Sequence, residues 1–519
     1  MKSWKKFSLG AGMYAVMSVI AKAIGVLYRI PLTNALGAEG IGLYQMIFPL
    51  YSLILAVSCG GMPTAISKHI SELTATKNSI AATKTLKVCL VAFFITGVIF
   101  SLFIFAFRKQ IATLQGNAKA SLSYAVLPPA IIFSGIIACF RGYFQGKQNL
   151  LPSGVSLIVE QVFKVVLGLG LALAFSDKGV EYAAMGAIIG ISISEAVAAA
   201  YLAVRYVWSN KTRVAPNVNA EIAADVVIMP NVKTNSILKS IYSVLIPLTI
   251  GSLVMPLSQV LDSFLVVNLL IRRGGEANEA TALYGIFNGP VGSLLNMPTV
   301  ISAALATSML PKISYRAKKG ENISKVINGS VGMFLAISVP ISLALIISPT
   351  PILKILYASG LSEAELVVAS KILRIEGINV ALVGAVQLGA ATMQGITKVR
   401  IPVYNLLIGA ATKVVALLVL VPTMGVYGAA ISNVAFYLVT AVLDGLSVKK
   451  YCKEQITLKK LSKVFLSIGV FAISYATYFI FERAFSSIVA LFLSGFLATV
   501  TYLVIIIKTK CILFRETLF

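Results

Sequence analysis

Long apolar stretches separated by short polar segments dominate the chain. About 20 apolar residues cross a bilayer as a helix, and this pattern predicts an all-α polytopic membrane protein with about fourteen transmembrane helices. The predicted segments run over residues 8–30, 41–66, 85–107, 121–143, 152–176, 182–207, 237–268, 282–309, 327–349, 366–393, 401–423, 425–448, 461–481 and 486–507.

The composition agrees with this assignment. Hydrophobic residues make up 58% of the 519 residues and charged residues only 12%, against about 25% charged in soluble domains. The mean hydropathy is +0.90. The first apolar segment is longer than the core of a signal peptide and lacks a clear cleavage site, so we expect a retained helix.

The positive charge lies mainly on one side of the predicted membrane. The N-terminus, the even-numbered loops and the C-terminus carry 30 of the Lys and Arg residues, and the odd-numbered loops carry 8. The positive-inside rule then places both termini in the cytoplasm. This asymmetry accounts for most of the net charge of +25 without a nucleic-acid partner.

Two halves of the chain resemble each other. Residues 62–67 (Met-Pro-Thr-Ala-Ile-Ser) recur at 297–302 (Met-Pro-Thr-Val-Ile-Ser), and Lys164 matches Lys413. Six helices return the chain to its starting side, so the repeats have the same orientation and are related by an axis along the membrane normal. The predicted organisation is two pseudo-symmetric six-helix lobes with two appended helices: an N-lobe at 1–208, a cytoplasmic linker at 209–236, a C-lobe at 237–450 and helices 13 and 14 within 451–519.

Prolines inside several predicted spans indicate bends. Pro63 and Pro298 occupy matched positions in the repeats. They are either hinges for a moving bundle or static kinks that pack the helices.

The first segment carries two cations. Lys22, Gly25 and Arg29 are spaced to share one helix face, and a basic side chain near mid-bilayer usually faces a bundle interior or a watery cavity. This face suits an anionic ligand. The alternative is that both cations extend to opposite headgroup layers, because the helix is expected to end near Pro31.

Other charges lie within the predicted spans. Glu160 and Lys164 are four residues apart and are expected to neutralise each other. Lys164 and Lys413, at equivalent positions, are candidates for a shared central space. Asp262 lies on a polar stripe with Gln259, where it either binds a cation or proton that drives transport or pairs with a cation of the first segment.

Segment ten carries Lys371, Arg374 and Glu376. The last two are two positions apart, so they point to different faces and are expected to have different partners. Glu195 and Asp444 lie near equivalent ends of segments six and twelve and are expected near the membrane surface.

Several kinds of chemistry lack the residues they need. The sole histidine, His69, falls in a predicted polar loop, and the five cysteines show no CxxC pattern. We expect no metal site, no cofactor and no disulfide. A membrane-embedded transferase usually needs paired carboxylates or a histidine. This chain has neither an Asp-x-Asp pair nor a histidine in a predicted span, so it is not expected to be an enzyme.

Three motifs point to a family. Residues 25–37 (Gly-Val-Leu-Tyr-Arg-Ile-Pro-Leu-Thr-Asn-Ala-Leu-Gly), 39–44 (Glu-Gly-Ile-Gly-Leu-Tyr) and 61–68 (Gly-Met-Pro-Thr-Ala-Ile-Ser-Lys) resemble the stage V sporulation protein B group. That group lies in the multidrug/oligosaccharidyl-lipid/polysaccharide (MOP) exporter superfamily and is related to the MurJ-type lipid II flippases. The resemblance extends over the whole chain.

The resemblance implies an alternating-access flippase in the bacterial plasma membrane, and we expect it to be a monomer. Its substrate would be an undecaprenyl-pyrophosphate-linked cell-wall precursor, lipid II first, with another polyprenyl-linked glycan as the alternative. Lys22 and Arg29 match family positions that contact the pyrophosphate. Segments 41–66 and 282–309 lack the arginines of the better-known flippases, so Lys164, Arg374 or Lys413 would complete the phosphate site.

Two matters stay open at this stage. Asp262 and Glu160 are the candidates for coupling to Na⁺ or H⁺, with the membrane potential as another driving force. A cation-coupled drug exporter of the same superfamily is the competing function; it would need a predominantly acidic cavity, whereas the first segment is purely basic.

Overall fold

The computed structural model describes residues 2–76, 78–211, 234–452 and 458–508. These residues form helices with no β-strand among them, and each of the fourteen predicted segments coincides with helix. All-α polytopic architecture is thereby confirmed. Residues 212–233 of the predicted linker lie outside the described part of the chain.

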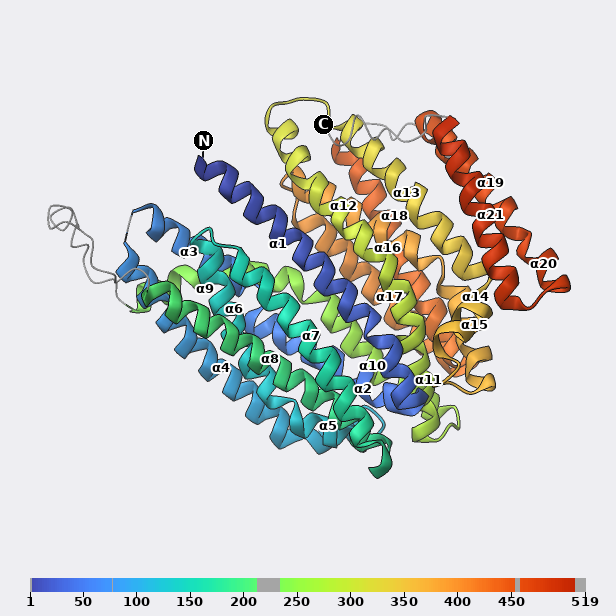
Figure 1. Ribbon diagram of the computed structural model, residues 1–519, viewed down its shortest axis with the longest axis horizontal. Helices are drawn as coiled ribbons and strands as arrows, with labels where there is room; N and C mark the ends of the chain where they lie inside the picture. Colours follow the sequence, from blue (N-terminus) through green and yellow to red (C-terminus); the bar gives the residue numbers. More distant parts are fainter. Residues whose placement is uncertain (1, 77, 212–233, 453–457, 509–519) are drawn as a thin grey trace. The chain divides into compact units, whose positions relative to one another are not determined.

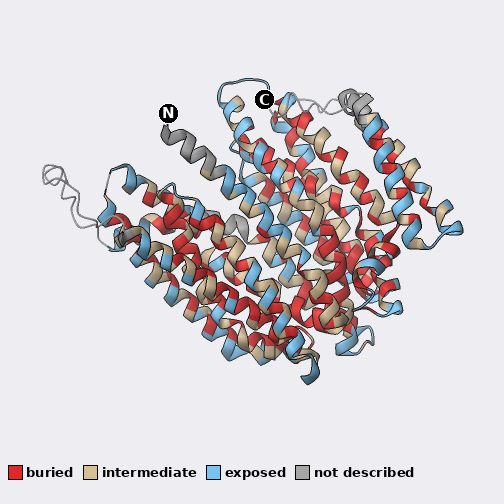
Figure 2. Ribbon diagram, viewed as in Figure 1, coloured by how far each residue is buried: buried red, intermediate tan, exposed pale blue. Residues whose placement is uncertain are grey.

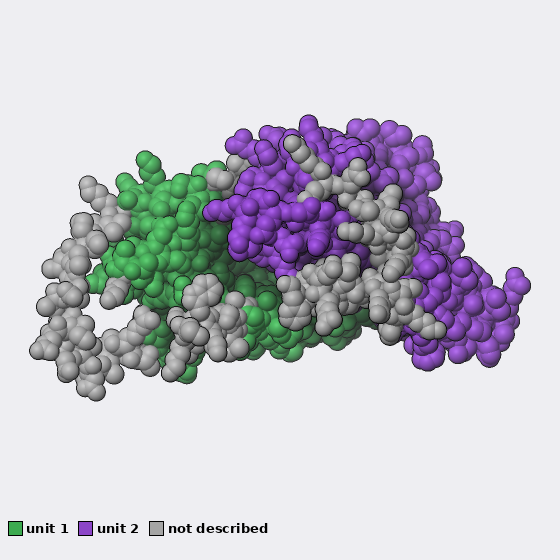
Figure 3. All heavy atoms as spheres, turned by 90° about the horizontal axis from the view of Figure 1, so that it is seen from above, with its two compact units in different colours: residues 1–36, 43–260 green, residues 37–42, 261–519 purple. Residues whose placement is uncertain are grey.

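Contacts divide the chain into two compact units, coloured separately in Figure 3: unit 1 is Met1–Leu36 with Leu43–Val260, and unit 2 is Gly37–Gly42 with Leu261–Phe519. The helices of unit 1 are α1 (Lys2–Leu27), most of α2 (Arg29–Cys59), α3 (Met62–Ala75), α4 (Ser79–Leu114), α5 (Ala120–Val126), α6 (Pro128–Gly146), α7 (Leu151–Ala174), η1 (Ser176–Lys178), α8 (Val180–Lys211), α9 (Thr234–Ser252) and the start of α10 (Val254–Arg272).

Unit 2 holds the remaining helices (Figure 1). They are the rest of α10, α11 (Ala277–Ile286), η3 (Phe287–Val291), α12 (Gly292–Lys318), α13 (Ser324–Ile347), α14 (Pro349–Tyr357), α15 (Glu363–Glu376), α16 (Asn379–Gly395), α17 (Arg400–Met424), α18 (Val426–Cys452), α19 (Leu458–Ala476), α20 (Tyr478–Ala484) and α21 (Ser487–Lys508).

Eleven described helical runs are long and apolar enough to cross a membrane, or up to twelve if the bent pair α5–α6 is one span. One run, Gly12–Ala75, contains the first two predicted segments. The predicted segment 366–393 is the one outside these runs, because it divides into α15 and α16, of 14 and 17 residues. Each is shorter than the roughly 20 residues that a straight span requires.

Apolar packing holds each unit together, and Figure 2 shows in red the buried positions along the helices. In unit 1, one cluster joins α3, α4, α6, α8 and α9. Ile237 and Ile241 of α9 belong to it, so α9 packs with unit 1 although the predicted C-lobe began at residue 237. In unit 2, the corresponding cluster joins α12, α13, α16 and α18.

Exposed apolar side chains suit a lipid environment. They run along α4, where Val91, Ile95, Ile99 and Leu102 are each more than half exposed. In water such an exposed apolar surface would promote aggregation, whereas in a membrane it can contact lipid acyl chains.

The appended helices dock on unit 2 through aromatic residues of α19 and α21. Phe471, Tyr475 and Tyr502 form a small cluster against α13. The hydroxyls of Tyr475 and Ser348 lie 2.6 Å apart, and Tyr502 donates to the carbonyl of Ala336 at 2.5 Å. Buried tyrosine hydroxyls need such partners, so these bonds fix where the helices sit.

The repeats share local geometry, as a duplication predicts. Ser71 donates to the carbonyl of Gly146 at 3.0 Å in unit 1, and Ser314 donates to that of Gly395 at 3.0 Å in unit 2. Gln148 (φ 57°) and Thr397 (φ 64°) are the two non-glycine residues with positive φ in the described chain, and each lies two residues beyond its glycine. The same strained turn therefore follows the same helix in both halves.

The matched prolines do not occupy matched environments. Pro63 lies in the first turn of α3, after a break at Gly60 and Gly61, whereas Pro298 lies inside the continuous helix α12. A first-turn proline removes no helical hydrogen bond. The two prolines are therefore not a pair of equivalent mid-helix bends.

Residues 37–42 of α2 belong to unit 2, and the helix is interrupted where they begin. Gly37 has φ 66° and ψ −176°, which interrupts the helix. Beyond it a Cβ on Gly42 would lie 2.9 Å from Thr281 Cγ2, and one on Gly285 would lie 2.6 Å from the Gly42 nitrogen. The glycines of this motif thus let α2 and α11 approach closely.

Candidate functional site

Unit 1 contains a cluster of paired charges on α6 and α7. The guanidinium of Arg141 donates to the Glu160 carboxylate at 2.8 Å through Nη2 and to Ser156 Oγ at 2.9 Å through Nε. Lys164 Nζ lies 3.8 Å from the other Glu160 oxygen. The predicted pairing of Glu160 with Lys164 is confirmed.

Arg141 is the member of this cluster that sequence reasoning missed. Arg141 is one of the 30 basic residues counted above on the cytoplasmic side, but α6 continues through it to Gly146. The signal was its position within the apolar segment 121–143, where a cation requires a partner. Gln161 completes the shell by donating to Glu160 Oε1 at 3.0 Å.

Glu195 is enclosed by protein and is only 6% exposed, rather than exposed near the bilayer surface as expected. Tyr51 of α2 donates its hydroxyl to Glu195 Oε1 at 3.3 Å, and the same hydroxyl lies 3.0 Å from Ser134 Oγ of α6. Tyr51 therefore supplies the polar partner that permits the burial of Glu195, and Ser134 is in turn a partner of Tyr51.

Unit 2 contains a buried ion pair between α10 and α17. Lys413 Nζ lies 2.5 Å from Asp262 Oδ2, and the two side chains are 6% and 8% exposed. The ammonium also lies 5.5 Å from the centre of the Phe436 ring, within range of a cation–π interaction. Asp262 thus pairs with Lys413 rather than with a cation of the first segment.

Two further buried acids of unit 2 accept hydrogen bonds from asparagines. Asn433 donates to Glu376 at 2.8 Å, and Asn405 donates to Asp444 at 2.7 Å. Asp444 is 1% exposed, so it too is enclosed rather than exposed near the surface. Glu376 is buried whereas Arg374 is exposed, which confirms that they face different surroundings.

The first-segment cations lack acidic partners. Lys22 is exposed on α1 and Arg29 is half-buried at the start of α2, and neither makes an ion pair within the described residues. Tyr28 keeps α-helical angles between the two helices, so the helical spacing of the two cations persists. Gly25 approaches α7: its Cβ would lie 2.7 Å from Gln161 Oε1.

The expected end of the first helix at Pro31 is wrong in detail. Proline has no N–H for the carbonyl four residues earlier, and α1 ends at that residue, Leu27. Helical geometry then resumes as α2 and runs past Pro31 to the break at Gly37.

His69 also differs from expectation. It lies within α3 rather than in a loop, and its Nδ1 is 3.2 Å from Ser240 Oγ of α9. Within the described residues no group of three His, Cys, Asp or Glu side chains is arranged to hold a metal ion.

Comparison with known proteins assigns the family. The polysaccharide biosynthesis protein family matches residues 9–316, more than half of the chain. The chain belongs to this family. It is a member of the MOP superfamily, which comprises transporters and flippases rather than enzymes.

Relatives from Bacillus subtilis (strain 168) are similar to this chain in sequence. Stage V sporulation protein B is 28% identical over 313 residues, covering 59% of this chain and 58% of that protein. The lipid II flippase MurJ is 25% identical over 470 residues, covering 86% and 83% of the two chains. The chain thus spans little more than half the length of stage V sporulation protein B in that alignment.

Solved structures share the fold. The inward closed conformation of the lipid II flippase MurJ superposes with a TM-score of 0.72 at 15% identity, covering 96% of this chain and 98% of that one. An inward-facing MATE-family multidrug transporter of the MOP superfamily reaches 0.64 at 16% identity, covering 83% and 94%. The predicted MurJ/MATE-like fold is confirmed, and the chain is a multi-pass membrane protein.

Proposed function

We propose that this protein is a flippase that moves an undecaprenyl-pyrophosphate-linked cell-wall precursor, of the lipid II type, from the cytoplasmic to the outer leaflet by alternating access. The observation that carries the proposal is that the acidic and basic side chains of the predicted spans differ in their surroundings. Each acid in the predicted spans is buried and accepts a hydrogen bond from a neighbouring side chain, whereas three candidate cations are exposed or half-buried and make no ion pair within the described chain. The acids are Glu160, Glu195, Asp262, Glu376 and Asp444, and the cations are Lys22, Arg29 and Arg374.

An excess of available cations suits an anionic headgroup. A pyrophosphate cannot cross hydrocarbon unaided, and charge-assisted hydrogen bonds from basic side chains replace part of its hydration. We assign Lys22 and Arg29 to the first contact with the phosphates. Lys164, Arg374 and Lys413 are further candidates, and Lys413 and Lys164 would first have to leave Asp262 and Glu160.

The same difference argues against a drug-cation exporter. Such a transporter needs acidic side chains accessible to a cationic ligand, and here the five intramembrane acids are buried and accept hydrogen bonds from neighbouring side chains, although only Glu160 and Asp262 pair with a cation. The sequence similarity to the lipid II flippase MurJ, over 86% of this chain, supports the flippase further.

Coupling would act through the paired acids. Asp262 and Glu160 can bind Na⁺ or H⁺ only when Lys413 and Arg141 move away, so ion binding and bridge opening would be linked. Alternatively the membrane potential drives the cycle, since moving one charge through it is worth about 2.3 kcal/mol per 100 mV. We propose a monomer in the bacterial plasma membrane with both termini cytoplasmic.

Rescue of a bacterium whose own lipid II flippase can be shut off tests the function. We expect the intact protein to restore growth and to prevent lipid II from accumulating on the cytoplasmic side. Lys22→Ala and Arg29→Ala should abolish rescue at equal protein level. Lys318→Ala removes an exposed cation from the end of α12 and should leave rescue intact.

Two results would contradict the proposal. If the intact, well-expressed protein fails to rescue, another polyprenyl-linked glycan becomes the substrate to seek among lipids that co-purify. If Lys22→Ala and Arg29→Ala both rescue, the phosphate contacts lie elsewhere.

A further inference from the structure

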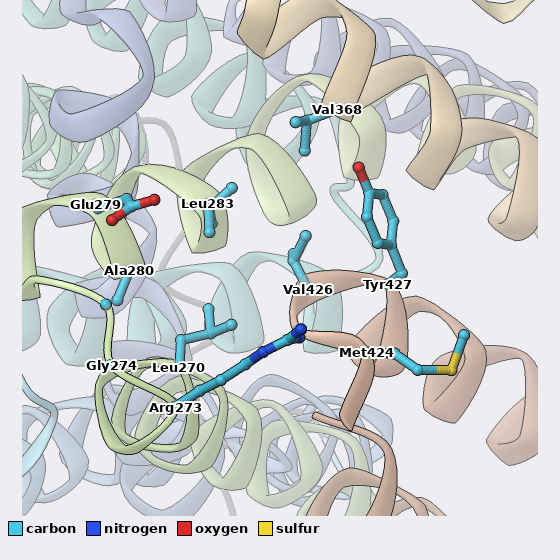
Figure 4. A pocket seen from close by; sticks show the side chains of 12 residues that line it. Leu270, Arg273, Gly274, Glu279, Ala280, Leu283, Val368, Met424, Val426 and Tyr427 are labelled. Atoms are coloured by element: carbon cyan, nitrogen blue, oxygen red, sulfur yellow. The ribbon is translucent and has the colours of Figure 1, made fainter. Parts of the chain in front are cut away.

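A second candidate site lies within unit 2, away from the buried ion pair. A pocket of about 420 Å³ opens where the α10–α11 connection meets the α17–α18 turn, with α15 on one side. Its volume falls within the range of roughly 300–1,000 Å³ typical of small-molecule sites. Figure 4 shows its side chains.

The pocket combines an apolar floor with two opposite charges. Leu270, Leu283, Val368 and Val426 line it, and Arg273, Glu279 and Tyr427 add polar groups. In Figure 4 the Arg273 side chain extends across the pocket towards Val426, while Glu279 lies on the α11 side. Neither charged side chain forms an ion pair within the described residues, so each is available to a ligand.

Glycine at 425 allows this placement of Arg273. Gly425 has φ +64°, and a Cβ there would lie 2.6 Å from Arg273 Nη1. Any other side chain would be strained and would push the guanidinium away. The turn therefore holds the cation against the pocket wall.

The backbone N–H groups of the three glycines that line the pocket are not available to bind an anion. The N–H groups of Gly274, Gly275 and Gly425 donate to the carbonyls of Ile271, Leu270 and Val421 within their own turns. Recognition must then come from side chains. A bare phosphate would meet the negative charge of Glu279, and a neutral sugar would leave both charges unpaired.

We propose that this pocket binds a short peptide that carries a free carboxylate and an amine. Arg273 binds the carboxylate as a bidentate pair, Glu279 binds the amine, and the apolar floor receives the small side chains between them. That the peptide arrives as the peptide arm of a lipid-linked precursor rests on the proposed flippase function; binding of the peptide itself does not.

Titration calorimetry of the full chain in nanodiscs tests the proposal. The probes are N-acetyl-Lys-D-Ala-D-Ala, which has an amine and a carboxylate, and its C-terminal amide. Charge-assisted hydrogen bonds make the acid bind about tenfold or more tightly than the amide. Arg273→Gln should remove this difference, and Glu279→Gln should weaken both probes by a similar factor.

Arg272→Gln is the matched control, because Arg272 is the exposed neighbour of Arg273 and does not line the pocket. It should bind both probes as the unmodified protein does. The proposal is overturned if the two probes bind alike, if Arg272→Gln acts like Arg273→Gln, or if no saturable binding occurs at about 1 mM probe.

The rescue experiment separates this proposal from the flippase. Peptide binding without rescue would support the pocket and contradict the proposed function. Rescue without peptide binding would support the function and overturn the pocket.

Discussion

Removing one partner of the Asp262–Lys413 pair should destabilise unit 2 far more than removing both. Each side chain is less than one-tenth exposed, and the charged atoms are 2.5 Å apart. Breaking a buried pair from one side typically costs about 3–5 kcal/mol, because the remaining charge is left uncompensated, whereas apolar replacement of both is often neutral. The Asp262 carboxylate depends strongly on Lys413, because its Oδ1 has no hydrogen-bond partner within the described chain.

The comparison uses four proteins: the unmodified chain, Asp262→Val, Lys413→Met and the double variant. We expect each single variant to unfold on the order of 6–10 °C lower, taking about 2 °C per kcal/mol for a domain of roughly 250 residues. The double variant should lie close to the unmodified protein. Because each single variant costs about 3–5 kcal/mol and the double variant costs almost nothing, the cycle would then give a coupling free energy of about 6–10 kcal/mol.

Thermal unfolding can be followed at Cys452, which is buried in the apolar cluster of unit 2. A thiol-reactive dye labels it on unfolding when the other four cysteines are replaced by alanine. Single variants that each shift the midpoint by less than about 2 °C, or a double variant as unstable as the sum of both, would refute the argument that burial makes this pair interdependent. If the stable double variant also rescues flippase depletion, the pair is structural and Asp262 carries no coupling ion.

Three other predictions concern stability and can be measured by the same thiol labelling on unfolding, with buried Cys89 as the reporter of unit 1 and Cys452 as the reporter of unit 2. Arg141→Gln should cost about 1–3 kcal/mol, less than a fully broken pair because a lysine still lies beside the carboxylate; an effect as small as that of an exposed cation would contradict the buried cluster. Gly142→Ala should destabilise unit 1, since its Cβ would lie 2.8 Å from that of Ile66. Gly170→Ala, with no atom within 4 Å, is its control and should be neutral or stabilising by up to about 1 kcal/mol. Thr397→Gly should raise stability by relieving a left-handed backbone costing about 1–2 kcal/mol, and an unchanged midpoint would show that the turn is unstrained.

Local rules explain why part of the candidate site was predictable. Glu160 and Lys164 are one helical turn apart, and any continuous helix brings them together whatever surrounds it. The opposite faces of Arg374 and Glu376 follow from the same periodicity. The free cations of the first segment were likewise visible as charges in an apolar stretch.

Long-range partners were not predictable. Asp262 and Lys413 are 151 residues apart, and their meeting depends on how α10 and α17 are rotated and how deep each residue lies. Arg141 was missed because it lies at the end of an apolar segment. A cation there can belong either to the helix or to the following loop, and only the position of the helix end distinguishes the two. Helix boundaries depend on packing as well as on propensity.

The sequence by itself determined the helical class, the number of apolar segments, the duplication and the family, because each rests on composition, period or local motif. Only the tertiary structure decided which charges neutralise each other and which remain available, that α9 packs with unit 1, and that Arg273 and Glu279 line one pocket. The physical reason is that a buried charge is stable only with a specific partner, and that partner is chosen by the packing of helices far apart in the chain.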